Sequence, residues 1–225
     1  MASVAVRCDG LAADAAALAE ARDILSPDER SRAERFRFDR DRRRFMMRRA
    51  IARRVLGGIV DVPPQALDFV ENDYGKPVLV GGPCFSLSHS ADLMMIAVAD
   101  RPVGCDIERI DPSIDWREIA SGLFGAGELR ALEALPEHAA RRAFFDCWAR
   151  KEAFVKALGL GLSYPLSAFT VSVAGPARLL SGGAGWAMSV PPAPASHAAA
   201  VAAVDDGAPL VITYIAPARS VPIAA

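Results

Sequence analysis

The clearest alternation of hydrophobic and polar positions lies in residues 26–56, where it predicts helical structure. Met47, Ile51 and Val55 recur every four residues, so one helical stripe faces a core while arginines occupy much of the remaining surface. The segment opens with Ser26, a proline, and a glutamate three residues after the serine, which is the capping-box pattern. The pattern therefore predicts one or two helices that begin at Ser26.

Short alternating or apolar runs separated by glycine, proline and aspartate follow in residues 66–110 and predict three or four strands. Helical spacing returns in residues 115–135 and 137–160. A closing set of strands joined by Gly/Pro loops is predicted between residues 163 and 215. Helices followed by strands thus occur twice. This order indicates an α+β protein made of two similar halves of about 100 residues each.

Length and composition narrow the class of protein. The chain has 225 residues, of which 52% are hydrophobic and 24% charged, so it can bury a core of its own. A formal net charge of -1 argues against a nucleic-acid partner, and no apolar run of about 18 residues suggests a membrane span or a secretory leader. The four cysteines are far apart and lack metal-binding spacing. These features predict a reduced, cytoplasmic protein without nucleic-acid or membrane partners.

Lysine is rare in this chain and is therefore informative. Of the 26 basic residues only Lys76, Lys151 and Lys156 are lysines, and such a bias toward arginine is typical of a GC-rich genome. An ammonium group suits a single phosphate oxygen or a proton relay better than a guanidinium group does. The retained lysines therefore favour phosphate chemistry, and the alternative is that they survive by chance on the surface.

The segment 32–54 contains eleven arginines interleaved with apolar residues. Glu34, Asp39 and Asp41 could pair with these arginines on a solvated helix face, and this interpretation is preferred for the segment taken alone. The alternative is an anion site for phosphate or nucleic acid.

Three carboxylates have a spacing that suits a metal ion. Asp106 and Glu108 are two residues apart in a predicted strand, so both point to one face. Glu152 and Lys156 are four residues apart in a predicted helix and share one side of it. Carboxylates placed in this way can bind Mg2+ when phosphate oxygens complete its octahedron. The alternatives are a solvent-facing acid pair and an ordinary Glu–Lys ion pair on a helix.

His89 and Lys76 are two further candidates. Alternation in FSLSHS places His89 on the face of Phe85 and Leu87, and three serines on the opposite face. Lys76 stands between a glycine and a proline, which predicts a stiff turn that holds its side chain outward. Each residue is either a contact for a phosphate group or an ordinary structural or surface residue.

Four motifs occur together in the order GKP at 75–77, FSLSHS at 85–90, GCDIE at 104–108 and WARKEAFVKALGLGL at 148–162. Together they resemble the Sfp-type 4'-phosphopantetheinyl transferase superfamily over roughly residues 30–175. The resemblance implies transfer of the 4'-phosphopantetheine arm of coenzyme A to a serine of an apo acyl or peptidyl carrier protein. Mg2+ would be required, and adenosine 3',5'-bisphosphate would be released.

The resemblance also implies a fold. It predicts an α+β, α/β sandwich-like pair of similar subdomains related by a pseudo-twofold axis, with the active site between them. The predicted units are an N-terminal subdomain at 1–103, a C-terminal subdomain at 104–216 and a flexible tail at 217–225. Because the trimeric carrier-protein synthases have about half this length, the resemblance implies that this chain acts as a monomer.

Carried onto this sequence, the resemblance assigns Mg2+ to Asp106, Glu108 and Glu152. Glu152, Lys156 and Asp106 would be the catalytic residues. In these roles Glu152 is the general base for the carrier serine, and Lys156 neutralises charge on the pyrophosphate. The phosphates of coenzyme A are assigned to Arg44, Lys76, Ser88, His89 and Lys156.

Carrier recognition is predicted for residues 123–135, where Leu123, Phe124 and Leu129 could meet the apolar face of a carrier helix. Two competing functions use the same residues. One is a Mg2+-dependent phosphoesterase that acts on coenzyme A or nucleic acid. The other is an RNA-binding module built on the arginine-rich segment.

Overall fold

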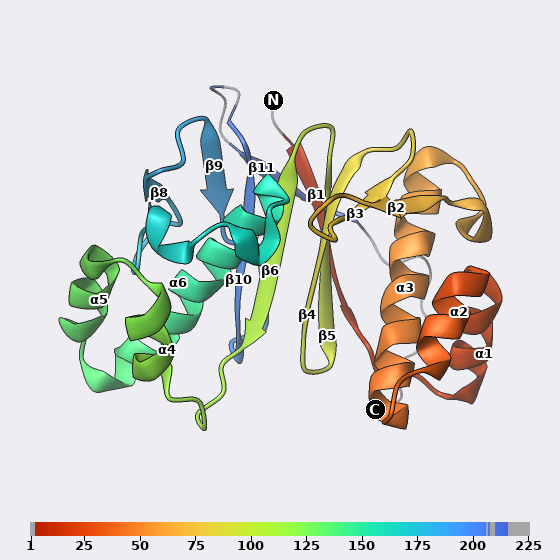
Figure 1. Ribbon diagram of the computed structural model, residues 1–225, viewed down its shortest axis with the longest axis horizontal. Coiled ribbons are helices and arrows are strands. Elements are labelled where there is room, and N and C mark those ends of the chain that lie inside the picture. The colour runs from red at the N-terminus through yellow and green to blue at the C-terminus, as the bar shows by residue number, and fades with distance from the viewer. Residues whose placement is uncertain (1–2, 206, 208–209, 216–225) are drawn as a thin grey trace.

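The structure is a computed structural model that describes residues 3–205, 207 and 210–215. Its N-terminal half begins with a strand, continues through three helices and ends with strands (Figure 1). In chain order these elements are β1 (Ser3–Gly10), α1 (Ala15–Ile24), α2 (Pro27–Glu34), α3 (Asp39–Val60), β2 (Phe69–Glu71), β3 (Pro77–Leu79), β4 (Cys84–Ser90) and β5 (Leu93–Ala99).

The C-terminal half repeats that order of elements. Its elements are β6 (Val103–Arg109), α4 (Trp116–Leu123), α5 (Ala126–Glu133), α6 (Glu137–Leu158), β7 (Thr170–Val171), β8 (Leu179–Ser181), β9 (Trp186–Ser189) and β10 (His197–Val204). A further strand, β11 (Val211–Tyr214), follows. Short 3-10 turns connect helices to strands at Pro64–Ala66, Gly161–Ser163 and Leu166–Ala168.

The two halves also share a strand order. β1, β5 and β4 are neighbours in one sheet, and β6, β10 and β9 are neighbours in the other, with antiparallel pairing in both sets. Each half thus builds the same three-strand unit in the same chain order. The predicted α+β fold of two similar subdomains is confirmed. The boundary between residues 103 and 104 stays a prediction, and the predicted tail at 217–225 lies outside the described residues.

The first and last described strands differ from the sequence expectation. β1 has no counterpart among the predicted elements. β11 was expected to close the C-terminal half, but it pairs in parallel with β1, with Ser3 opposite Val211. The sheet that a short apolar strand joins depends on contacts far away in the sequence, so local alternation did not reveal this pairing.

Helices form the outer layers of the molecule and the two sheets form the inner layers (Figure 1). On β5, Met94, Ile96 and Val98 pack with the residues of α3, whereas Met95 and Ala97 pack against the other sheet. β10 alternates in the same way between α6 and the central layer. This period of two allows each sheet to bury both faces, and it confirms the predicted sandwich-like arrangement.

Local sequence explains the helices. Ser26 Oγ accepts a hydrogen bond from the Glu29 amide and the Glu29 carboxylate accepts one from the Ser26 amide, so the predicted capping box is confirmed. α3 buries the predicted stripe of Met47, Ile51 and Val55. α3 and α6 each have 22 residues. Neither these two nor any other helix in the described ranges combines the length and apolarity that a membrane crossing needs.

Candidate functional site

The two halves meet where β4 lies beside β6, and this junction carries the predicted acidic cluster. Ser88 Oγ donates to Asp106 Oδ1 at 2.7 Å, and Ser90 Oγ donates to Glu108 Oε2 at 2.8 Å. The predicted alternation of β4 is confirmed, because these serines face β6 while His89 faces a cavity on the other side. The N-terminal half therefore supplies hydroxyl groups that orient carboxylates of the C-terminal half.

Asp106 is the most buried carboxylate of the cluster, with 1% of the residue exposed. Its Oδ1 also accepts from Lys156 Nζ at 2.6 Å, and the same ammonium donates to Ser88 Oγ at 2.9 Å. Asp106 Oδ2 is buried and has no hydrogen-bond partner among the residues that the structure describes. Leaving a buried carboxylate oxygen without a partner is unfavourable. This oxygen is therefore suited to a ligand.

Glu108 and Glu152 lie close enough to Asp106 to respond to its charge. Burial, followed by the charge of Asp106, raises the pKa of Glu108 to about 7. The same two causes raise the pKa of Glu152 above its ordinary value. The three carboxylates therefore repel one another, and a bound cation would relieve that repulsion.

The donor set of this cluster fits a hard divalent cation such as Mg2+. Within the described ranges, no group of three or more acidic, histidine or cysteine side chains is arranged to hold a metal ion by itself. Mg2+ does not require such a cage, because it keeps several waters and uses one or two carboxylates together with substrate phosphates. Asp106, with its unpartnered Oδ2, and a neighbouring carboxylate could therefore hold the ion, and the assignment of all three carboxylates to Mg2+ stays a prediction.

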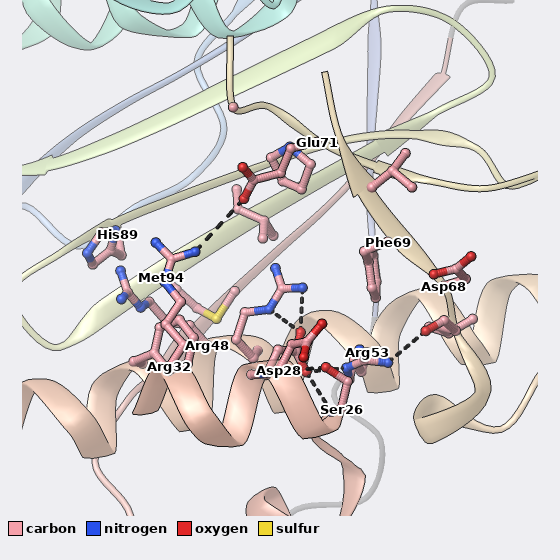
Figure 2. A pocket seen from close by; sticks show the side chains of 18 of the residues that line it. Ser26, Asp28, Arg32, Arg48, Arg53, Asp68, Phe69, Glu71, His89 and Met94 are labelled. Carbon is pink, nitrogen blue, oxygen red and sulfur yellow. Dashed lines mark hydrogen bonds and ion pairs between the residues drawn. The ribbon is translucent and has the colours of Figure 1, made fainter. Parts of the chain in front are cut away.

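A cavity of about 550 Å³ lies on the other side of β4, between that strand and the helices α2 and α3. Figure 2 shows Arg32, Arg48 and His89 on the same side of this cavity. Ser88 also belongs to its wall. Ser88 also hydrogen-bonds Asp106, so this one residue links the cavity wall to the acidic cluster.

His89 is a neutral group in a positively charged environment. Burial, followed by the charges of Arg48, Lys156 and Arg44, lowers the pKa of His89 to about 4. The imidazole is therefore neutral at pH 7 and can donate one hydrogen bond. An anion bound among these three cations would offset their mutual repulsion.

The cavity contains arginines that are available to a ligand. Among the described residues, Arg35 and Arg48 form no ion pair with a carboxylate, and Arg32 only approaches Glu71 at 3.9 Å. Guanidinium groups without close carboxylate partners are well suited to bind phosphate. The sequence did not single out these residues among the eleven arginines, because helical spacing alone does not show which of them face a cavity.

Two other arginines of the cavity wall have a structural role. Arg53 Nε donates to Glu29 Oε2 at 2.7 Å, and Arg49 forms an ion pair with the same carboxylate. Arg53 is buried and also donates to the carbonyl oxygens of Pro64 and Leu67. This network joins α2, α3 and the segment before β2. This buried network is not the solvated face that the sequence predicted; that face is formed by the exposed pairs of Arg42 and Arg43 with Asp39 and of Arg40 with Asp41.

Arg44 and Lys76 lie outside the cavity wall. Arg44 forms an ion pair with Asp92 at 2.6 Å. Lys76 was expected to point outward, and this expectation is wrong. Its ammonium points into the structure and donates to the carbonyl oxygens of Val103 at 3.0 Å and Lys156 at 2.7 Å. The carbonyl groups of a neighbouring helix end attract the ammonium, and no local pattern in the turn could indicate that neighbour.

Lys151 is a structural residue. It is fully buried, forms an ion pair with Glu128 Oε1 at 2.8 Å, and donates to the carbonyl oxygens of Leu166 and Phe169. Sequence reasoning missed Glu128, because an acid on a short helix gives no local sign of burial. The pair joins α5 to α6 and to the loop after α6.

The prediction that Phe124 meets a carrier protein is wrong. Phe124 is buried, with 5% of the residue exposed, and its ring stacks on Phe144 at a centroid distance of 5.5 Å. Leu129 is only partly buried and packs against the same core. Leu123 is 39% exposed and is the remaining accessible apolar residue of the three predicted contacts.

Replacing Phe124 with Asp is expected to lower the free energy of unfolding by about 3 kcal/mol or more, because a charge would be buried among aromatic rings. Urea denaturation followed by circular dichroism measures this loss. Leu123→Asp is the matched control, and its unfolding midpoint should remain close to that of the unmodified protein. Equal midpoints for the two variants would contradict the buried position of Phe124.

Both halves of the chain match family models. Residues 13–101 match the model described as 4'-phosphopantetheinyl transferase, N-terminal. Residues 102–201 match the model described as 4'-phosphopantetheinyl transferase superfamily. The duplicated fold, the acidic cluster between its halves and these adjoining matches agree, and the chain belongs to the 4'-phosphopantetheinyl transferase superfamily.

Three relatives with assigned names are similar to this chain. The 4'-phosphopantetheinyl transferase psf-1 of Bacillus pumilus is 41% identical over 149 residues, which cover 65% of this chain and 63% of psf-1. HetI of Nostoc sp. is 39% identical over 145 residues, covering 62% of this chain and 61% of HetI. Sfp of Bacillus subtilis strain 168 is 32% identical over 150 residues, covering 66% of each chain. The matched region thus spans slightly less than two thirds of each relative's length.

Proposed function

We propose that this protein transfers the 4'-phosphopantetheine arm of coenzyme A to a serine hydroxyl of an apo acyl or peptidyl carrier protein. Adenosine 3',5'-bisphosphate is the second product. One observation carries the proposal: the cation-lined cavity reaches Ser88, whose hydroxyl bonds Asp106 in the acidic cluster. A cationic cavity that suits phosphate thus lies next to the carboxylates proposed to hold Mg2+, and this arrangement supports coenzyme A as the substrate. The names of the three relatives support the same reaction.

The adenosine end of coenzyme A would occupy the cavity. Its 3'-phosphate would lie beside Arg32 and Arg48, and the neutral His89 would donate a hydrogen bond to it. Arg44 adds to the positive potential there, because its charge reaches His89. The pyrophosphate would then extend past Ser88 toward Lys156.

In the transfer step, the serine oxygen of the carrier forms a bond to the phosphorus that bears the pantetheine arm. The bond from that phosphorus to the bridging oxygen breaks, and its electron pair leaves with adenosine 3',5'-bisphosphate. Glu152 accepts the serine proton, and burial together with the charge of Asp106 raises its pKa, which makes it a stronger base than an exposed glutamate. The Lys156 ammonium neutralises charge on the leaving phosphate. Mg2+, held by Asp106, Glu108 and Glu152, would supply further charge neutralisation when bound.

The proposal includes a monomer that works in the cytoplasm. Ser88 from one half and Asp106 from the other build the cluster within a single copy of the chain. All four cysteines are free, as expected in a reducing compartment. The net charge of -1 argues against nucleic acid as a partner.

The intact mass of an apo carrier protein, measured after incubation with this protein, coenzyme A and Mg2+, tests the reaction. The expected result is a gain in carrier mass of one phosphopantetheine, and no gain when the incubation contains EDTA. Carriers from fatty acid synthesis and from a peptide synthetase are both used. Hydrolysis of coenzyme A without any gain in carrier mass would replace the proposal with a Mg2+-dependent phosphoesterase.

Arg48→Ala is expected to raise the KM for coenzyme A by about tenfold, because one charge-assisted contact to the 3'-phosphate is lost. The KM for 3'-dephospho-coenzyme A should be the same in the variant and in the unmodified protein. Arg40→Ala is the matched control, since Arg40 lies on the same helix, is exposed and pairs with Asp41. A similar rise in KM for both coenzymes would contradict the assigned place of the 3'-phosphate.

A further inference from the structure

The turn between β2 and β3 in the N-terminal half contacts the end of α6 in the C-terminal half. Asn72 Nδ2 donates to the carbonyl oxygen of Gly159 at 2.8 Å. Lys76 Nζ donates to the carbonyl oxygen of Lys156 at 2.7 Å and to that of Val103 at 3.0 Å. Two side chains of one turn thus hold the last residues of the helix that carries Glu152 and Lys156.

The turn is built to present these two side chains. Asn72 Oδ1 accepts hydrogen bonds from the backbone amides of Tyr74 at 3.0 Å and Lys76 at 2.8 Å. The backbone amide of Asn72 also donates to the carbonyl oxygen of Lys76, and Gly75 has a φ of 80° that closes the turn. Because Asn72 Oδ1 accepts hydrogen bonds within the turn, the side-chain nitrogen Nδ2 of Asn72 is directed toward α6. The contact is therefore part of a defined local structure.

These contacts satisfy groups that a helix end leaves unpaired. The last carbonyls of a helix have no partner within the helix and carry its partial negative charge, so an ammonium placed there is favourable. Gly159 ends α6 with a φ of 73°, and a Cβ on it would lie 3.1 Å from Asn72 Nδ2 and 3.3 Å from Lys76 Cδ. The glycine thus permits the close approach of the turn.

Lys76 joins the two elements that form the acidic cluster. Val103 begins β6, which carries Asp106, and Lys156 lies in the last turn of α6. The Lys156 side chain bonds Asp106 while its carbonyl oxygen is held by Lys76. The Lys76 ammonium group is therefore hydrogen-bonded to the backbone of both β6 and α6, the two elements that carry the Lys156–Asp106 ion pair.

We infer that Lys76, assisted by Asn72, is a positioning residue that holds the last turn of α6 on β6 and thereby keeps Lys156 on Asp106. The inference rests on the proposed transferase function for its effect on catalysis. It differs from the direct phosphate contact that the family resemblance implies for Lys76. Gly75 and Pro77 line the cavity whereas Lys76 does not, and both hydrogen bonds of its ammonium go to backbone carbonyls.

Hydrogen–deuterium exchange of the full chain, without coenzyme A, measures how firmly the turn holds the end of α6, independently of activity. Lys76→Met keeps the length of the side chain but removes its donors, and exchange at residues 155–159 is expected to become about tenfold faster. Asn72→Ala should have a smaller effect in the same direction and serves if Lys76→Met does not fold. Asp73→Ala, an exposed change in the same turn, is the control and should leave the exchange rate unchanged.

Transfer kinetics and calorimetric binding of coenzyme A then separate positioning from phosphate binding. Lys76→Met is expected to lower kcat by about tenfold while coenzyme A affinity stays within about twofold, and Lys76→Arg should recover part of the loss. Exchange at residues 155–159 that stays at the original rate in both Lys76→Met and Asn72→Ala overturns the inference, whatever happens to affinity. A protein that transfers nothing overturns the proposed function instead, and the exchange result still decides the positioning role.

Discussion

Asp106→Asn is expected to lower kcat/KM for carrier modification by about a thousandfold, with the fold retained. In the structure Asp106 Oδ1 accepts from both Lys156 and Ser88, while Oδ2 is buried and free for a cation. An asparagine has nearly the same shape but no charge, and its amide group offers donors where the ammonium and the metal need an acceptor. The substitution thus removes the partner of Lys156 and a metal ligand together.

The rate of carrier mass gain at limiting coenzyme A measures this loss, and near-ultraviolet circular dichroism checks the fold. Asp146→Asn is the matched control, because Asp146 lies on α6 and pairs with Arg142 at 3.0 Å rather than with the cluster. Its activity should remain close to that of the unmodified protein. If Asp106→Asn retained more than about a tenth of the original activity, the central role of this carboxylate in the charge balance would be wrong.

Gly104→Ala is expected to lower the free energy of unfolding by about 3 kcal/mol or more and to abolish transfer. A Cβ at this position would lie 2.0 Å from the carbonyl oxygen of Ala153 and 2.3 Å from the backbone nitrogen of Ala157. These are backbone atoms of α6, so a side-chain rotation cannot relieve the clash. The helix would have to move away from β6, and that movement would separate Lys156 from Asp106.

Urea denaturation gives the loss of stability, and the carrier assay gives the loss of activity. Gly58→Ala on α3 is the matched control, since nothing lies within 4 Å of the added Cβ. This control should leave activity unchanged and raise stability by about 0.5 kcal/mol, because alanine is the better helix former. A Gly104→Ala protein with the original unfolding midpoint would show that α6 does not approach β6 as closely as the structure has it.

Local spacing was sufficient to predict part of the candidate site. Asp106 and Glu108 share a face of β6 because side chains of a strand alternate, and Glu152 lies near Lys156 because helical neighbours recur at four residues. The sequence did not show that Ser88, 18 residues before Asp106, would bond to it. Contacts of that kind depend on how the two halves pack.

Burial was the property that the sequence predicted least well. Phe124, which caps the short helix α4, and Lys151, on the long helix α6, have local patterns that suit a binding surface or a charged helix, and both are buried. Lys76 is likewise turned inward by the carbonyls of a helix 80 residues away. A side chain's exposure depends on which element covers it, and that element is not encoded in its neighbours.

The sequence by itself determined the duplicated α+β order, the capped helix at Ser26 and the shared faces of the carboxylates proposed for catalysis, because these follow from short-range periodicity and hydrogen bonding. Only the tertiary structure decided which arginines face the cavity, that β11 joins the sheet of β1, and that Lys76 holds the end of α6. Those features arise from contacts between segments far apart in the chain. Such contacts are selected by the packing of the whole molecule rather than by local pattern.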